Sequence, residues 1–487
     1  MNGEQQPPQD FNATTSYSIE TEIPAQHIGE LMEFIDRKYI AVQPERFANV
    51  AKQVIEGNAS LTFTILDSAG KQSLMVEIIG SKPIKLSITK LDNTIASERV
   101  NQVKQDIVIL MGFFEEQVES TTLFFAWREG EEIVPEKLSG KEKKPINRLF
   151  LETQILLSAI FISVGMFLFF VIGWLAPIVL LILQLVFVFF SNKFIARAAD
   201  WRITQNNPYI HLMEYYLPVK DHEEFRQKFS KDEVQSIKKE IYDQTLAKNG
   251  DISCETVQEV LSTHGFECKS QDLSTRKVDV YKLVKKTVDD FGMPMPEIVV
   301  SNTIIPNAAA SGPSPARGVV LITTGLLVQL SEEEILTVLG HEFGHLRGRD
   351  PLVLYALTAI EFLLRFYVFL PLFPAIFSSY LFLLYFWAVM TLIFFIAKFF
   401  EARADLVSAI VIGEPKVLAE ALEKIGFKRL LYERTPSYRF QEWISLDPHP
   451  PIYFRVARLE KLEVPVKIKH PLVQSASDVI HGFLASF

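Results

Sequence analysis

Two long stretches of the chain contain almost no charged residue. The first, from Thr153 to Asn192, contains none at all. As a single α-helix it would be about 60 Å long, twice the hydrocarbon thickness of a bilayer, so the pattern predicts two membrane spans. The sequence Gly173-Trp-Leu-Ala-Pro177 supplies a turn between them.

The second apolar stretch runs from Pro351 to Ala397 and is interrupted by two further prolines, so it also predicts two spans. Two such stretches in one chain indicate insertion into a membrane. Glu361 and Arg365 lie one helical turn apart within the third span, where we expect them to form an ion pair. A role in handling substrate or in lining a wet cleft is the alternative.

Basic residues flank the predicted spans, whereas the two turns inside the hairpins are uncharged. The flanking residues are Lys141, Lys143, Lys144 and Arg148 before the first span, Lys193, Arg197 and Arg202 after the second, Arg347 and Arg349 before the third, and Lys398 and Arg403 after the fourth. By the positive-inside rule both hairpins enter from the cytoplasm. All soluble segments and both termini are therefore expected on that side.

The soluble segments mix alternating and helical patterns. Between residues 17 and 135, strands are predicted at SYSIETEI, SLTFTIL, SLMVEII, IKLSITKL and TLFFAW, and helices at HIGELMEFIDRKYI and ERVNQVKQDIVILMGFFEEQV. This pattern is typical of an α+β domain with an antiparallel sheet. No catalytic spacing occurs in it, so a regulatory or substrate-recruiting module and a plain scaffold both stay open.

The next soluble segment, residues 203–300, is predicted to be mostly amphipathic helix. After it, PEIVVSN and GVVLITTGLL are strand-like and flank the loop IIPNAAASGPSPARG. The polar residues 1–16 lack the apolar region of a signal peptide and are predicted to be a disordered tail.

The amino-acid composition limits the classes of molecule that the protein is expected to bind. Hydrophobic residues make up 48 % of the 487 residues and charged residues 22 %, which fits soluble domains joined to membrane spans. The net charge of −9, without a basic stripe interleaved with aromatics, argues against nucleic acid. The two cysteines, Cys254 and Cys268, predict reduced structural thiols rather than a disulfide framework.

The segment SEEEILTVLGHEFGHLRGRD carries candidate chemistry. Ser331 and Glu334 form a predicted capping box that begins a helix. On that helix His341 and His345 share one face, so both imidazoles can reach one metal ion. Glu342 lies beside that face, where its carboxylate can accept a proton from a metal-activated water. A pair of surface histidines beside a helical glutamate is the alternative.

A catalytic zinc needs a third protein ligand. Glu361 lies inside a span, about 24 Å from His345 if the helix continues. Glu401 is the better candidate, because FEARAD follows the fourth span and returns to the membrane face from which the third span departs. Asp405, one turn further, could orient a ligand imidazole; a surface carboxylate beside Arg403 is the alternative.

The order of motifs resembles the HtpX-type membrane zinc metalloproteases, a family that also includes the more distant CAAX prenyl proteases. The motifs are IIPNAAASG, TTGLL, SEEE, HEFGHLRGRD, a two-span hairpin, FEARAD and HPPIYFRVARLEKL. The resemblance runs from about Val278 to Leu462, with the first hairpin also in register. Residues 1–140 lie outside it.

The resemblance implies one Zn²⁺ per chain and a role for each matched residue. The implied zinc ligands are His341, His345 and Glu401; the implied general base is Glu342; His449 and Arg455 stabilise the oxyanion; and Asn307, Ala308, Ala309 and Ala310 pair with the substrate backbone. Ala309 stands where the family commonly has an aromatic residue. A helix-start His-Pro and a surface arginine are the alternatives for His449 and Arg455.

The predicted fold is an α-helical membrane metalloprotease of the gluzincin type with four transmembrane helices and an N-terminal α+β domain. The segments are the tail 1–16, the α+β domain 17–140, the hairpins 149–193 and 351–397, and the two catalytic parts 203–350 and 398–487.

The predicted function is zinc-dependent endopeptidase cleavage of misfolded or damaged membrane proteins at the cytoplasmic face of the plasma membrane. Expected partners are those substrates, the lipid bilayer and other membrane quality-control proteases. A CAAX-type processing protease and a non-catalytic zinc-containing sensor are the alternatives. The glutamate between the two histidines argues against the sensor, because it adds nothing to metal binding.

Overall fold

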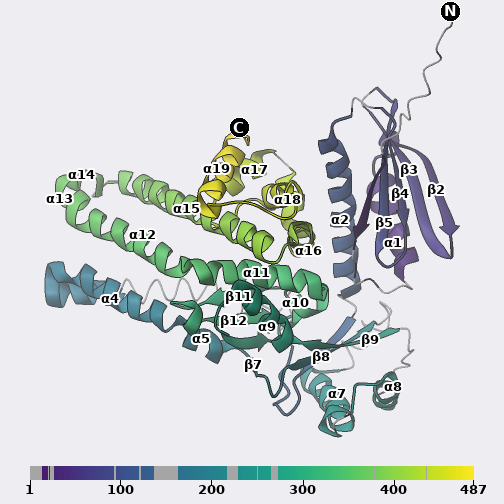
Figure 1. Ribbon diagram of the computed structural model, residues 1–487, viewed down its shortest axis with the longest axis horizontal. Coiled ribbons are helices and arrows are strands. Elements are labelled where there is room, and N and C mark those ends of the chain that lie inside the picture. The colour runs from purple at the N-terminus through teal and green to yellow at the C-terminus, as the bar shows by residue number, and fades with distance from the viewer. Residues whose placement is uncertain are drawn as a thin grey trace, which may run out of the picture. The chain divides into compact units, whose positions relative to one another are not determined.

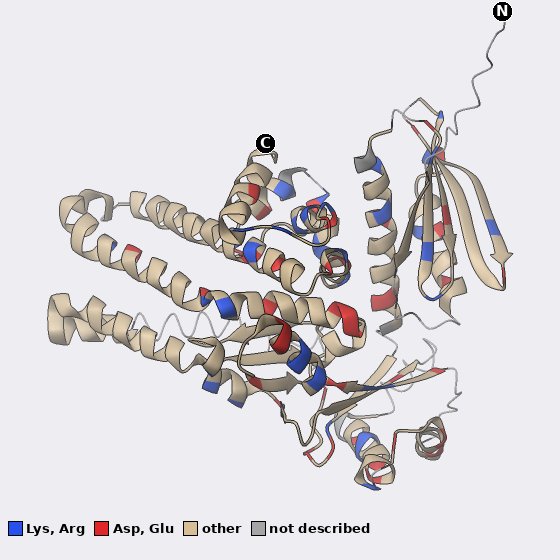
Figure 2. Cartoon of the chain, viewed as in Figure 1, with Lys and Arg blue, Asp and Glu red and all other residues tan. Residues whose placement is uncertain are grey.

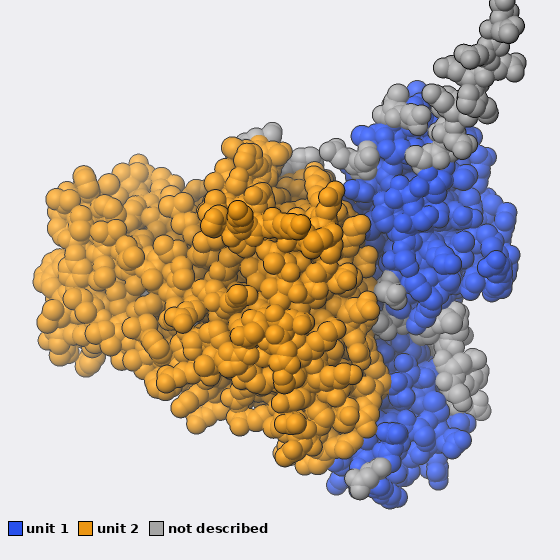
Figure 3. All heavy atoms as spheres, in the orientation of Figure 1, with its two compact units in different colours: residues 1–124, 213–275, 426–431 blue, residues 125–212, 276–425, 432–487 orange. Residues whose placement is uncertain are grey.

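The computed structural model describes residues 14–19, 21, 23, 27–67, 69–92, 95–119, 122–136, 163–216, 229–248, 250–264, 272–377, 379–434 and 436–486. The chain forms two compact units, coloured separately in Figure 3. Unit 1 comprises residues 1–124, 213–275 and 426–431, and unit 2 comprises residues 125–212, 276–425 and 432–487. Cys268 and the predicted start of the first span, residues 149–162, lie outside the described residues.

Unit 1 contains a five-stranded antiparallel sheet in the order β1-β5-β4-β3-β2 (Figure 1). Its elements are β1 (Thr14–Ile19), α1 (Ile28–Ile35), a π-helical turn (Asp36–Ile40), a 3₁₀ turn (Pro44–Arg46), β2 (Phe47–Ile55), β3 (Asn58–Leu66), β4 (Gln72–Ile79), β5 (Ile84–Lys90) and α2 (Ser97–Glu119). The strands and both helices bury one continuous apolar core. Alternation along the strands predicts which side chains enter it.

Two details of this sheet differ from the sequence prediction. Strand β1 begins at Thr14, inside the segment predicted to be a disordered tail. The sequence pattern also does not predict strand β2. Phe47 is the one buried residue of this strand, and the remaining residues show no apolar alternation.

Three further strands between residues 122 and 279 also differ from the sequence prediction. TLFFAW is a strand, β6 (Thr122–Trp127), but it belongs to a separate three-stranded sheet in the order β6-β8-β9. The strands β8 (Tyr209–Tyr216) and β9 (Leu273–Asp279) lie in a segment predicted to be mostly helical. Six of the eight residues of β8 are buried, so the strand lacks the alternation that would reveal it. The helices of this segment are α7 (Lys231–Gln244), α8 (Cys254–Thr263) and α9 (Val280–Phe291), with a 3₁₀ turn at Leu246–Lys248.

Unit 2 contains a four-stranded sheet in the order β11-β12-β10-β7. Its strands are β7 (Trp201–Ile203), β10 (Glu297–Ser301), β11 (Ala308–Ser311) and β12 (Val319–Thr323). The predicted loop thus contains the edge strand β11, antiparallel to β12. The second half of GVVLITTGLL is a helix, α10 (Thr324–Gln329), because Thr323 caps it by accepting a hydrogen bond from the Leu326 N–H.

The elements not yet named are helical and lie mostly in unit 2. They are a 3₁₀ turn (Gly173–Leu175), α4 (Ala176–Phe189), α5 (Ser191–Ala198), α11 (Glu332–Gly348), α12 (Asp350–Leu364), a π-helical turn (Arg365–Phe369), α13 (Leu370–Leu372), α14 (Pro374–Phe377), α15 (Leu381–Val411), α16 (Pro415–Glu433), α17 (Pro436–Ile444), α18 (Ile452–Glu460) and α19 (Pro471–Leu484), with a further 3₁₀ turn at Pro315–Arg317. Figure 1 shows α12 and α15 as a long helical hairpin.

Three helical stretches of the described residues are long and apolar enough to cross a membrane: Ser163–Phe189, Asp350–Leu372 and Leu381–Val411. The first of them turns back on itself. A Cβ added to Gly165 would lie 2.9 Å from Leu180 Cδ1, whereas the two residues would be about 22 Å apart along one straight helix. Gly173, where the turn is expected, has a φ of +57°.

The tips of the two hairpins lie together. The Tyr367 hydroxyl donates a hydrogen bond to the Trp174 carbonyl, and the rings of Phe366 and Trp174 are 5.2 Å apart. Residues 163–192 and 366–397 contain no charged side chain, and basic residues occur where the helices leave these apolar segments (Figure 2). The two hairpins therefore point the same way.

Glu361 and Arg365 form the expected ion pair. Arg365 Nη2 lies 3.0 Å from Glu361 Oε2, and the Tyr385 hydroxyl of α15 donates to Glu361 Oε1 at 3.0 Å. The Arg365 guanidinium also lies over the ring of Phe386. This carboxylate is therefore fully partnered within the apolar hairpin, which suits a charge that must be tolerated in a membrane.

Helices α11 and α15 approach each other closely because two glycines of α11 face α15. A Cβ on Gly344 would lie 3.1 Å from Ala404 Cα, and one on Gly340 would lie 2.6 Å from Ser408 Oγ. That hydroxyl is held in place, since it donates to the Thr337 carbonyl at 2.8 Å. The glycines thus set the distance between the two helices.

Replacing Gly340 by valine should force α11 and α15 apart. Overpacking of this kind costs about 1–3 kcal/mol. We expect the purified protein to unfold at a lower temperature in a thermal melt. Gly29→Val is the matched control, because Gly29 is exposed, also helical and has no atom within 4 Å of an added Cβ. Equal melting temperatures for the two variants would contradict this packing account.

Candidate metal centre

Helix α11 carries the two histidines and starts as the sequence predicts. The Ser331 hydroxyl accepts from the Glu334 N–H, and the Glu334 carboxylate accepts from the Ser331 N–H at 2.9 Å. This capping box fixes the first turn of the helix. His341 and His345 are four residues apart and lie on the same face of this helix. Their Nε2 atoms are 3.2 Å apart.

Glu401 of α15 completes a group of three. One of its oxygens, Oε2, is 3.5 Å from His341 Nε2, and the other, Oε1, is 3.3 Å from His345 Nε2. One potential ligand atom from each of the three residues lies within 4.8 Å of the others, so the group could hold a metal ion. These three residues are called the ligand cluster below. The close packing of α11 on α15 brings these residues together.

The chemistry of the group fits a divalent transition metal. Two imidazole nitrogens and a carboxylate are the donors that zinc accepts. Glu401 is 8 % exposed, and its Oε2 is a buried oxygen that accepts no hydrogen bond. A buried carboxylate oxygen is normally satisfied, so this atom indicates a missing positive partner.

The surrounding charges also favour a cation. Burial of His345 opposes its protonation, but the carboxylates of Glu401 and Asp350 outweigh burial and raise its pKa to about 10. The pKa of His341 is raised in the same way, against burial, by Asp405 and Glu401. Positive charge is therefore stabilised where the two imidazoles meet.

Asp405 holds the first imidazole from behind. Its Oδ1 lies 2.9 Å from His341 Nδ1. Arg455 of α18 donates two hydrogen bonds to the same carboxylate, from Nε at 2.8 Å and from Nη2 at 2.6 Å. Asp405 and Arg455 are 1 % and 5 % exposed, so neither is a surface residue. The ring nitrogen that faces away from the ligand cluster is thereby fixed, which orients the imidazole.

Asp350 does the same for the second imidazole. Its Oδ2 lies 2.8 Å from His345 Nδ1 and accepts from Arg403 Nη2 at 2.7 Å. Arg403 also donates to the Gly344 carbonyl at 3.0 Å. Each ligand imidazole is thus backed by an aspartate, and each aspartate by an arginine.

Sequence reasoning missed Asp350 and Arg403 in these roles. Five residues separate Asp350 from His345, which on one continuous helix would put them on different faces. The helix ends instead at Arg349, which adopts the left-handed conformation with φ of +54° and turns Asp350 back toward the histidine. Arg403, which the alternative interpretation placed beside a surface Asp405, pairs with Asp350.

Glu342 points at the edge strand β11. Its Oε2 accepts a hydrogen bond from the Ala310 N–H at 2.9 Å. This N–H therefore faces away from β12, and the alternation of an antiparallel strand turns the N–H of Ala308 the same way. Asn307 anchors the start of the strand, since its N–H donates to Thr323 Oγ1 at 2.8 Å. The open edge of β11 thus faces the helix that carries the histidines.

His449 lies at the exposed side of the group. Its Nε2 is 3.6 Å from Glu401 Oε2, and its Nδ1 is 2.8 Å from Asp447 Oδ1. The side chain is 45 % exposed. The structure thus brings His449 to the ligand cluster, whereas the guanidinium of Arg455 points at Asp405.

Comparison with known proteins identifies relatives of this chain. The sequence profile of Peptidase family M48 matches residues 274–463. A protein named Protease HtpX homolog 2 from Methanosarcina acetivorans is 30 % identical over 202 residues, which cover 35 % of this chain and 68 % of that protein. A Protease HtpX homolog from Desulforapulum autotrophicum is 31 % identical over 208 residues, covering 37 % and 67 %.

Among solved structures, the crystal structure of S. mikatae Ste24p covers 36 % of this chain and 49 % of its own, with 20 % identity and a TM-score of 0.29. A score this low does not define a shared fold. The family profile covers both helices that carry His341, His345 and Glu401, and two curated relatives are at least 30 % identical over two thirds of their length. The chain therefore belongs to the M48 peptidases and, among them, to the HtpX-like membrane metalloproteases.

Proposed function

We propose that the protein is a zinc endopeptidase that cleaves misfolded or damaged membrane proteins at the cytoplasmic face of the plasma membrane. The observation that carries the proposal is the convergence of His341, His345 and Glu401 beside a further carboxylate, Glu342. The first three residues would hold one Zn²⁺ per chain. The fourth is free of the ligand cluster and can take part in proton transfer.

A zinc ion held there supplies Lewis-acid chemistry, polarising the scissile carbonyl and lowering the pKa of water. Glu342 takes the proton of the attacking water and delivers it to the leaving amine. The N–H of Ala310 holds this carboxylate on the side of the helix that faces the edge strand. The base is thereby kept beside both the ligand cluster and the strand.

The substrate backbone binds along β11. An extended peptide can add a strand to the open edge of the sheet, using main-chain groups of residues 307–310. Because that edge faces α11, a peptide paired with it lies over His341 and Glu342. The small side chains of the three alanines leave the approach unobstructed.

His449 donates a hydrogen bond to the oxyanion of the tetrahedral intermediate. Its exposed position beside Glu401 leaves the imidazole accessible to a substrate, and Asp447 orients it. One such donor contributes about 2.7–4 kcal/mol to transition-state stabilisation. Two nitrogens of Arg455 are engaged with Asp405, so we assign Arg455 to the positioning of His341 rather than to the oxyanion.

The cytoplasmic orientation and the four-span plan rest on charge and on the parallel hairpins. Lys193, Arg197, Lys398 and Arg403 follow the apolar segments, whose tips are uncharged. The ligand cluster lies just beyond the apolar part of α15, close to where that helix leaves the membrane. A protease with its reactive centre there is suited to substrates that are themselves anchored in the bilayer.

Glu342→Gln should retain zinc and lose cleavage. The amide can still accept from the Ala310 N–H but cannot take a proton, so we expect the rate on an unfolded reporter protein to fall about 10²–10⁴-fold. Zinc content and the rate are measured on the same preparation, with Glu333→Gln on the exposed first turn of α11 as the control. A wild-type rate with zinc bound would remove Glu342 from the mechanism.

The same variant tests the substrate class. An inactive Glu342→Gln protein should retain substrates, so we expect membrane proteins to be enriched with it over the Glu333→Gln control after isolation from membranes. Enrichment of soluble proteins alone would contradict the proposed substrate class while leaving the protease assignment intact.

Glu401→Gln should weaken zinc binding, whereas Glu361→Gln should not. Both glutamates follow the histidines, but Glu361 is committed to Arg365 and Tyr385 inside the hairpin. Zinc affinity is measured by competition with a chelator. If Glu401→Gln binds as tightly as the wild type and Glu361→Gln does not, the third ligand is Glu361.

The two aspartates behind the imidazoles should each contribute to zinc affinity. We expect Asp350→Asn and Asp405→Asn to weaken zinc binding about 10–100-fold, as is usual when a group that orients a ligand is changed. The control is Asp290→Asn on the exposed face of α9. Zinc affinities equal to that of the control would show that the two aspartates only stabilise the fold.

A further inference from the structure

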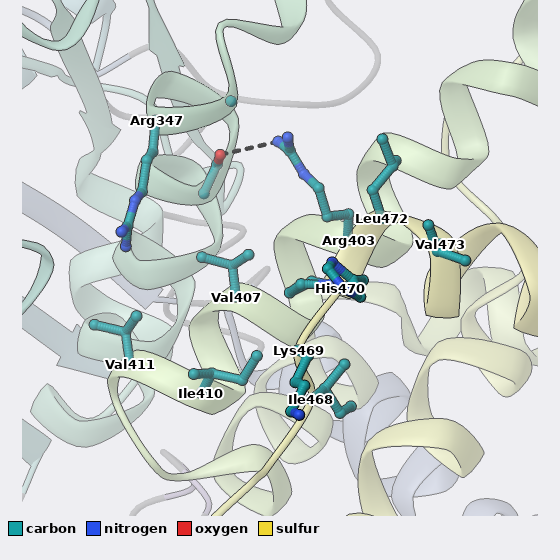
Figure 4. A pocket seen from close by; sticks show the side chains of 13 residues that line it. Arg347, Arg403, Val407, Ile410, Val411, Ile468, Lys469, His470, Leu472 and Val473 are labelled. Atoms are coloured by element: carbon teal, nitrogen blue, oxygen red, sulfur yellow. Dashed lines mark hydrogen bonds between the residues drawn. The ribbon is translucent and has the colours of Figure 1, made fainter.

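Helix α19 runs alongside α15 toward the membrane. The first turn of α19 lies beside the part of α15 that follows the span, where Val473 lines a pocket together with Arg403 and Val407 (Figure 4). The last turn of α19 lies beside the apolar part of α15, where the rings of Phe483 and Phe395 are 5.3 Å apart. The two helices are therefore antiparallel.

The end of α19 reaches the predicted boundary of the hydrocarbon core. Phe395 comes two residues before Ala397, the last residue of the apolar stretch, so it lies about 3 Å inside that boundary. Arg403 and Val407 lie about 9 and 15 Å beyond the boundary. The headgroup layer on each side of the core is only about 5–8 Å thick. The first turn of α19 is therefore level with water, and its last turn is level with lipid.

The exposed side chains at the membrane end of α19 are apolar. Ile480 and Leu484 lie one turn apart on the same face and are 43 % and 60 % exposed. The opposite face is packed inside the protein, where Val479 is fully buried. Residues 479–487 include no aspartate, glutamate, lysine or arginine, and Asp478 just before them pairs with Arg458 at 2.7 Å. An apolar surface at this depth suits lipid rather than water.

The loop before His449 brings another apolar side chain to the same depth. Lys398, the first residue of α15 after the apolar stretch, donates hydrogen bonds to the carbonyls of Ser445 and Asp447. Leu446 lies between these two anchored residues and is 52 % exposed. Since the Asp447 carboxylate contacts the imidazole of His449, this loop connects the apolar surface with the exposed side of the ligand cluster.

We propose that Leu446, Ile480 and Leu484 insert into the adjacent face of the bilayer and form a membrane contact that does not span it. The occupant of this surface is lipid, because the surface is continuous with the outside of the span, where Leu392 is 58 % exposed. Interfacial helices are held at a membrane by partial insertion of apolar side chains in this way. The contact keeps the loop that carries His449 at the membrane surface.

The test is the depth of spin labels on the full-length protein in nanodiscs of phosphatidylcholine and phosphatidylglycerol. Single labels are attached to Leu446→Cys and to Leu484→Cys, in a background that carries Cys254→Ser and Cys268→Ser. For each label, accessibility to oxygen, which concentrates in lipid, is divided by accessibility to a nickel chelate, which stays in water. Both substituted side chains are exposed, so the labels do not disturb the core.

Two further labels calibrate the ratio of oxygen to nickel accessibility. Leu392→Cys, on the exposed surface of the span, gives the value in lipid. Val473→Cys is the matched control, because Val473 is also apolar and 69 % exposed and lies three turns before Leu484 on the same face of α19. We expect the ratios at Leu446→Cys and Leu484→Cys to exceed that at Val473→Cys and to approach that at Leu392→Cys.

Two results would overturn the proposal. A ratio at Leu446→Cys or at Leu484→Cys equal to that at Val473→Cys would place that side chain in water. Shielding of either label from both reagents would show that a protein surface covers it, such as a second copy of this chain, instead of lipid. Because the two labels lie on different elements, the loop and α19 are tested independently.

Discussion

The close approach of α11 and α15 is the constraint on which the ligand cluster depends. HEFGH and FEARAD are far apart in the sequence and are separated by a hairpin of apolar residues. They meet because Gly340 and Gly344 present no side chain toward Ser408 and Ala404. A helix pair at ordinary separation would leave Glu401 too far from the imidazoles to share one ion with them. Gly340 and Gly344 are therefore as much a part of the centre as its ligands.

Burial of this many charges requires that each be paired. Within the described residues, the two imidazoles face Glu401 on one side and an aspartate each on the other, and each aspartate meets an arginine. A buried carboxylate or a buried arginine without such a partner would be costly. The alternation of sign fixes the rings, and it leaves Glu401 Oε2 as the one buried ligand oxygen of the cluster without a hydrogen bond. The unpartnered Glu401 Oε2 marks the position beside the imidazoles as one where positive charge would be stabilised.

Much of the ligand cluster could be predicted from the sequence, because the positions of its residues depend on local helical periodicity. The capping box, the shared face of His341 and His345, and the choice of Glu401 over Glu361 follow from helix geometry and from the return of a hairpin to one membrane face. The pairs formed by Asp350 with Arg403 and by Asp405 with Arg455 do not, since they depend on the left-handed turn at Arg349 and on the packing of α18. Strands β2 and β8 were hidden for a related reason, because one is almost wholly exposed and the other almost wholly buried.

The central claim is that His341, His345 and Glu401 together hold one zinc ion. X-ray absorption spectroscopy of the zinc-loaded protein tests it directly, because it reports the atoms bound to the metal. The account predicts a shell of nitrogen and oxygen atoms at about 2.0–2.2 Å, with the outer scattering of two imidazoles and no sulfur. A sulfur shell at about 2.3 Å, or the scattering of a single imidazole, would place the metal elsewhere in the protein and contradict the claim.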